Sequence, residues 1–77
     1  MENKKTNDEL VTIIEVNQLT TAYMLQGVLE GANIQVFLQN ELTAQLYGNC
    51  AGGIAIQVKD KDAEKARNLL IENGYNL

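Results

Sequence analysis

Histidine, proline and tryptophan are absent from this 77-residue chain, and cysteine occurs once. The single cysteine, Cys50, cannot form a disulfide within the chain, and without histidine it cannot complete the four Cys or His ligands of the usual structural zinc site. The lack of histidine also removes the commonest general base and any Ser–His or Cys–His nucleophile pair. We therefore expect no metal and no cofactor, and the sequence favours a protein that is not an enzyme.

Long apolar runs and an excess of positive charge are missing as well. No stretch approaches the ~20 apolar residues of a membrane span, and the N-terminal sequence MENKKTNDE lacks the apolar region of a secretory signal peptide. Ten acidic residues against six lysines and arginines give a formal net charge of -4, which disfavours binding to nucleic-acid phosphates. The sequence therefore predicts a cytoplasmic protein that binds neither membranes nor nucleic acid.

Hydrophobic periodicity predicts three strands and two helices in the order β-α-β-β-α. Short β-branched or alternating segments predict strands at residues 10–16, 34–39 and 53–58. Apolar residues at spacings of three and four predict a helix over residues 18–32 and a second helix that ends at about residue 73. Residues 1–9 show no such period, and we expect them to form a disordered arm on a single domain of residues 10–77.

Particular residues mark the ends of the two helices. Asn17 and Asp60 are the expected N-caps, because their side chains can accept a hydrogen bond from a first-turn N–H. Gly74 is expected to stop the second helix in the left-handed conformation. Gly27, inside the first helix, costs about 1 kcal/mol relative to alanine, and we interpret it as a point of close packing on the sheet.

The order of the elements predicts an α+β fold of the ferredoxin-like type. The right-handed crossover rule makes the first two strands parallel. The third strand then fits between them, antiparallel to both, which is the split βαβ arrangement without its usual fourth strand. We expect a three-stranded sheet with both helices on one face and with the strand of residues 10–16 as an open edge.

Alternation along the strands predicts an apolar strip on the sheet face turned away from the helices. The strip consists of Val11, Ile13, Phe37 and Ala55. A contiguous exposed apolar strip usually marks an interface, so we expect a homo-oligomer, a dimer or a trimer, that uses this face. The alternative is that the arm or the long connection between the last two strands folds over the strip.

The connection of residues 40–52 contains the unusual stretch YGNCAGG. A glycine-rich backbone can form a nest of N–H groups that holds an anion, but the frame of a phosphate loop is missing, and a flexible hairpin connection is the alternative. A site for a small ligand or a partner protein is predicted near this connection, at Asn40, Glu41, Tyr47, Gly52 and Gly53.

A small enzyme, or an enzyme subunit with an active site shared between protomers, is the alternative function. Its reactive group would be Glu15, on the outward sheet face, or Cys50. No cationic residue that would favour a thiolate lies near Cys50 in the sequence.

Four stretches carry a resemblance to a known family: LQGVLEGANI, VFLQNE, GGIAIQV and VKDKDAEKARNLL. Over about residues 10–73 the chain resembles the prokaryotic signal-transducing proteins, a domain family of unknown function grouped with the nitrogen-regulatory PII-like superfamily. The resemblance implies a bacterial protein with a ferredoxin-like fold, a role in sensing or protein interaction, and, as in PII-like proteins, sheets of neighbouring subunits that face one another in a trimer. PII proteins bind nucleotide through a long loop and basic residues, whereas residues 40–52 contain neither lysine nor arginine.

Overall fold

A computed structural model describes residues 9–40 and 49–75, with residues 49–52 described in their backbone only. The elements, in chain order, are β1 (Leu10–Gln18), α1 (Leu19–Glu30), β2 (Phe37–Gln39), β3 (Asn49–Lys59), the 3-10 helix η2 (Asp60–Asp62) and α3 (Ala63–Glu72). The predicted β-α-β-β-α order is confirmed. The predicted arm at residues 1–9 lies outside the described residues except for Glu9, whose carbonyl accepts a hydrogen bond from the Asp60 N–H at 2.7 Å.

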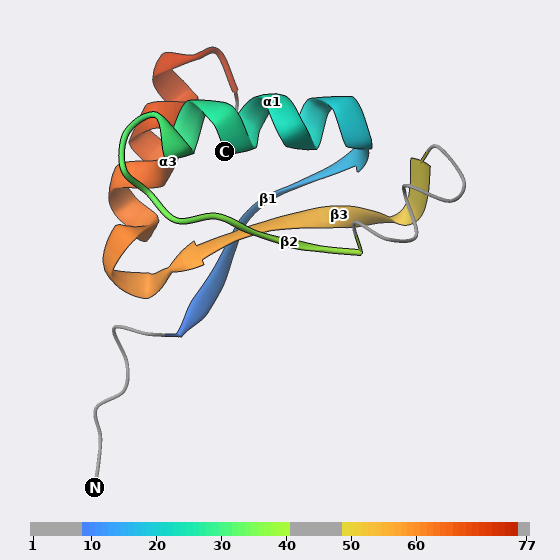
Figure 1. Cartoon of the computed structure of the whole chain (residues 1–77), viewed down its shortest axis with the longest axis horizontal. Coiled ribbons are helices and arrows are strands. Elements are labelled where there is room, and N and C mark those ends of the chain that lie inside the picture. The colour runs from blue at the N-terminus through green and yellow to red at the C-terminus, as the bar shows by residue number, and fades with distance from the viewer. Residues whose placement is uncertain (1–8, 41–48, 76–77) are drawn as a thin grey trace, which may run out of the picture.

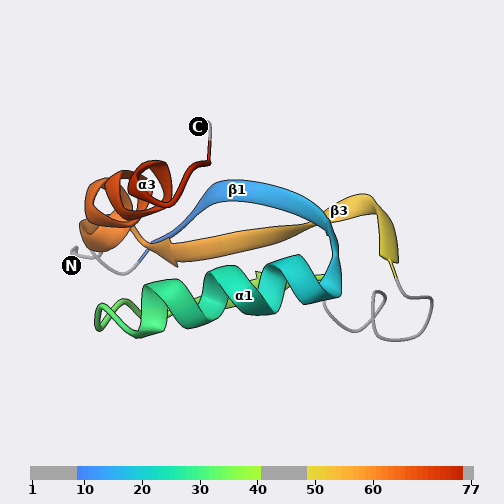
Figure 2. The ribbon, with the colours of Figure 1, turned by 90° about the horizontal axis from the view of Figure 1, so that it is seen from above.

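The sheet has the strand order β1-β3-β2, and β3 pairs antiparallel with both neighbours. The two edge strands are therefore parallel to each other, as the crossover rule predicts. Both helices lie on the same side of the sheet in Figure 1, and in Figure 2 α1 follows the sheet lengthwise while α3 is seen almost end-on. The fold is the predicted three-stranded α+β arrangement.

The hydrophobic core lies between this sheet and the two helices. Its fully buried large side chains include Leu25 and Leu29 of α1, Ile54 and Ile56 of β3, and Leu70 of α3. Every buried side chain among the described residues is apolar. Because burying a leucine- or isoleucine-sized side chain stabilises the fold by about 1.5–3 kcal/mol, this layer holds the two helices on the sheet.

The predicted starts of the second and third strands are wrong. β2 contains only Phe37–Gln39, so the segment before it reaches the core without pairing to a strand, although Ile34 and Val36 are buried. β3 begins at Asn49, four residues before the predicted start, because Gln18 at the end of β1 pairs with Asn49. An apolar alternating pattern reports burial, and burial extends beyond ladder pairing at Ile34 and Val36.

The predicted N-caps are also wrong by one and two residues. β1 continues through Asn17, and the residue that precedes α1 is Gln18, in extended conformation and without a side-chain capping bond. Asp60 begins the 3-10 helix η2, and Asp62 precedes α3. Pairing with β3 holds Asn17 in the strand, which removes it from the position at which its side chain could cap.

The helix C-termini end in left-handed residues. Gly74, at φ 96°, follows α3, and the N–H of Tyr75 donates to the Leu70 carbonyl at 3.1 Å. Asn33, at φ 67°, follows α1, and the N–H of Ile34 donates to the Leu29 carbonyl at the same distance. This six-to-one bond across a left-handed residue is the Schellman arrangement, so the predicted stop at Gly74 is confirmed.

A β-bulge in β1 overturns the predicted face of two residues. Thr12 pairs with Gln57 and Ile14 pairs with Ile56, so Ile13 is an extra residue in the ladder. The extra residue resets the alternation. Ile13 is 7% exposed and belongs to the core, and Val11 pairs with Val58 on the helix side. The prediction that Val11 and Ile13 face away from the helices is therefore wrong, whereas Phe37 and Ala55 do face away.

Gly27 is a further correction. It is exposed on α1, and a methyl group added there would meet no described atom within 4 Å. Close packing on the sheet does not explain this glycine.

Candidate functional site

The sheet face opposite the helices is the main candidate site. We call it the open face and define it by the residues that share it in the register: Leu10, Thr12, Glu15, Phe37, Gln39, Ala55, Gln57 and Lys59. No element within residues 9–40 and 49–75 lies on this side of the sheet in Figure 1. These residues form three rows that cross the strands.

The central row is uncharged and crosses all three strands. Thr12, Gln57 and Phe37 lie side by side in it, and the Gln57 amide donates to the Thr12 hydroxyl at 2.9 Å. Phe37 is half-buried and is the one aromatic side chain of the open face. This row offers a partner an apolar ring beside a fixed amide–hydroxyl pair.

The two outer rows carry charges of opposite sign. One row contains Glu15, Ala55 and Gln39, and the other contains Lys59 and Leu10. Glu15 is exposed and Lys59 is half-buried, and neither has an ion-pair partner among the described residues. The open face is therefore acidic at one end and basic at the other.

Two of the predicted ligand-site residues meet at the acidic end of this face. The Asn40 amide donates to the Gly53 carbonyl at 3.0 Å, and both residues have positive φ, 72° and 87°. A methyl group at Gly53 would lie 3.4 Å from Oε1 of Glu15. Glycine allows this backbone conformation without strain, and the Asn40 bond closes the base of the connection between β2 and β3.

The remaining predicted site residues are distributed differently. Glu41 and Tyr47 lie outside the described residues, and Gly52 belongs to β3. Cys50 is also in β3, where only its backbone is described, and Glu15 projects from the open face. The structure thus brings Asn40, Gly53 and Glu15 together. Of these three residues, the sequence places only Asn40 and Gly53 in the predicted ligand site, because the register of β1 cannot be read from the sequence.

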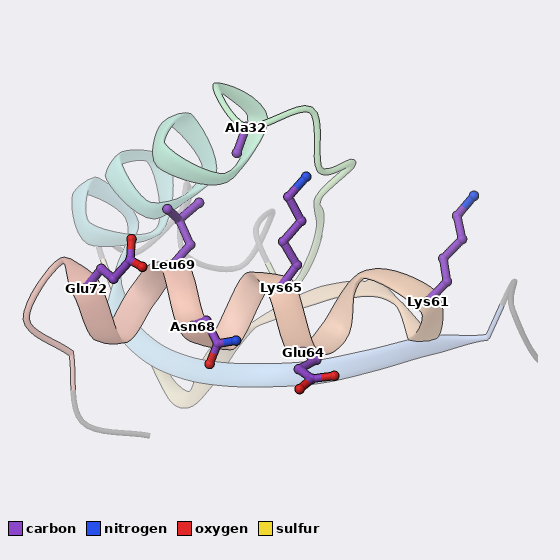
Figure 3. A pocket seen from close by; sticks show the side chains of 7 residues that line it. All are labelled: Ala32, Lys61, Glu64, Lys65, Asn68, Leu69 and Glu72. Atoms are coloured by element: carbon purple, nitrogen blue, oxygen red, sulfur yellow. The ribbon is translucent and has the colours of Figure 1, made fainter.

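A second candidate site, a hollow that the sequence analysis does not predict, lies on the helix side of the sheet. It has a volume of about 520 Å³ and is lined by Ala32, Lys61, Glu64, Lys65, Asn68, Leu69 and Glu72. In Figure 3 the side chain of Lys61, from η2, and that of Lys65, from α3, extend in the same direction, and Leu69 points toward Ala32, which follows α1. The hollow is open, and the two lysines and two glutamates in its lining give it charges of both signs.

Within the described part of the chain, no three His, Cys, Asp or Glu side chains gather where they could hold a metal ion. Neither of its α-helices has the length and apolar character needed to cross a membrane.

Comparison with known protein families gives a match over most of the chain. A family model described as "Putative prokaryotic signal transducing protein" matches residues 10–74, which cover all described elements. Searches of curated proteins and of solved structures give no match.

Proposed function

This chain belongs to the family of prokaryotic signal-transducing proteins, and from that premise we propose that it is a non-enzymatic regulatory module of the cytoplasm. The module binds other protein molecules through the open face, and the first partner that we propose is a second copy of the same chain. In this proposal the module is a homo-oligomer and is related to the PII-like proteins. The family description supports a role in signalling, and the open face supplies a surface for it.

The observation that carries the proposal is Phe37, which lies on the edge strand β2 in the central row of a sheet face that no described element covers. Completing the burial of a phenylalanine side chain contributes up to about 1.5–3 kcal/mol. In a symmetric dimer this contribution occurs twice. The neighbouring Thr12 and Gln57 side chains already form a hydrogen bond with each other. Covering them therefore leaves fewer buried polar groups without a hydrogen-bond partner.

The interior supports binding over catalysis. The described core consists of apolar side chains, and the polar groups of the candidate site lie on the surface. Acid–base catalysts are usually tuned by burial beside a specific partner. A surface that buries Phe37 on association requires no such tuning.

The test compares Phe37→Ser with Met24→Ser in sedimentation velocity from low to high micromolar protein. Met24 is 56% exposed on α1, a helix that lies on the other side of the sheet from the open face (Figure 1), so it controls for a general loss of surface apolarity. The wild type and Met24→Ser should associate alike, and Phe37→Ser should raise the dissociation constant about tenfold or more. Circular dichroism verifies that each variant is folded. A wild type that stays monomeric at high micromolar concentration refutes the proposal.

A further inference from the structure

The charges of the open face are arranged so that the face complements itself. Lys59 lies two residues from Gln57 on one side along β3, and Ala55, which pairs with Glu15, lies two residues away on the other side. The row between them is uncharged. Lys59 and Glu15 therefore lie in rows that are equally far, measured along the strands, from the row of Gln57 and on opposite sides of it.

The edges of the sheet are less suited to a second copy than the face. β1 carries the bulge at Ile13 and a second irregularity after Val16, and β2 has only three residues. Bulges and short edge strands are the devices by which proteins discourage pairing between sheet edges. The face is therefore the surface on which a second copy would pack.

Two sheets can face each other about a two-fold axis in two simple ways. An axis parallel to the strands places Lys59 of one copy over Lys59 of the other, and Glu15 of one copy near Gln39 of the other. An axis across the strands reverses the rows, so the Lys59 row of one copy lies over the Glu15 row of the other. The first brings like charges together, and the second brings opposite charges together.

We propose that two copies of this chain pack open face to open face about a two-fold axis that crosses the strands at Gln57, with Lys59 of each copy beside Glu15 of the other. This arrangement rests on the proposed function and specifies its interface. Facing sheets pack about 10 Å apart and neighbouring strands lie about 4.8 Å apart, a separation that the lysine and glutamate side chains bridge together. Phe37 then lies against its own copy near the axis, which accounts for an apolar ring in a row without charge.

The test is a charge-reversal cycle of Glu15→Lys, Lys59→Glu and the double variant, measured by sedimentation equilibrium. Each dimer contains two such pairs, and each single reversal replaces two attractions by two repulsions. Each single variant should therefore raise the dissociation constant about tenfold. The double variant restores opposite charges across the interface and should return the dissociation constant close to that of the wild type.

Matched controls separate this effect from net charge. Glu72→Lys and Lys65→Glu make the same changes in charge on α3, outside the open face, and should leave the dissociation constant unchanged. Added salt should weaken the wild-type dimer more than a dimer of Glu15→Gln with Lys59→Gln.

The outcomes distinguish the two proposals. A wild type that dimerises, but whose single reversals have no effect or whose double variant is not rescued, overturns the two-fold arrangement and leaves self-association standing. A tighter dimer for Lys59→Gln would indicate that lysines face each other, and would also overturn it. A monomeric wild type removes the proposed function, and this interface with it.

Discussion

Replacing Gly27 by alanine should stabilise the domain. Gly27 lies within α1, its added methyl group would meet no described atom within 4 Å, and its side of the helix is exposed. Glycine in a helix interior is destabilising by roughly 0.5–1 kcal/mol relative to alanine, because the glycine backbone loses more conformational entropy on folding. The substitution changes the unfolded chain and adds no contact in the folded one.

The expected gain is about 0.5–1 kcal/mol. A domain of this length has a total stability of roughly 4–12 kcal/mol, so the change is a measurable fraction. It corresponds to an increase of about 2–8 °C in the melting temperature of a domain of this size. Urea denaturation followed by circular dichroism measures the free energy of unfolding, and thermal melts measure the temperature shift.

Gly74→Ala is the matched control. A methyl group there also meets no described atom within 4 Å, but the residue has φ 96°. Alanine in the left-handed region costs about 1–2 kcal/mol, so the control should lower the midpoint while Gly27→Ala raises it. If Gly27→Ala lowers the urea midpoint, the reasoning is refuted, because the exposed side of α1 would then have to contact another segment or a second copy.

Two further stability predictions follow from the backbone. Asn33→Gly should be neutral or stabilise by up to about 1 kcal/mol, because glycine adopts the left-handed φ of 67° without strain, whereas Asn33→Val should destabilise the domain in the same urea assay. Ile13→Ala should cost about 2–4 kcal/mol, because the bulge places this side chain in the core. Thr12 is the exposed neighbour of Ile13, and Thr12→Ala should lower the free energy of unfolding by no more than about 1 kcal/mol. Equal losses of stability for Ile13→Ala and Thr12→Ala would contradict the bulge.

The sequence was sufficient for the layers and the strand order. Leu25 and Leu29 in α1, and Ala66 and Leu70 in α3, repeat at helical spacing, and the residues Ile54, Ile56 and Val58 alternate in β3, so the apolar pattern identified which sides meet in the core. The parallel relation of β1 to β2 followed from the handedness of the crossover. These features depend on many residues at once, and one local exception does not change them.

The phase of β1 could not be predicted, because it depends on one residue. LVTIIEV alternates equally well with Ile13 on either face, and only the pairings on each side of the bulge decide the matter. That single residue removes Val11 and Ile13 from the predicted strip and leaves Phe37 and Ala55 there. Their predicted part in an oligomer interface stays a prediction.

The candidate ligand site was partly predictable for a similar reason. Glycine and asparagine mark left-handed backbone, so Asn40 and Gly53 could be identified as a pair of turn residues. That Glu15 lies beside Gly53 depends on the register of a strand 38 residues away in the chain, which local patterns do not encode.

The middle strand of the sheet is the last strand to leave the ribosome. β1 pairs with β3 from Leu10 against Lys59, so a nascent chain that ends before β3 offers β1 no antiparallel neighbour and gives α1 no complete surface on which to bury Leu25. Contacts between distant parts of a chain form slowly because the intervening segment must first be closed into a loop. The domain therefore folds as a unit only after β3 has been synthesised, and truncation within β3 should abolish the fold as a whole.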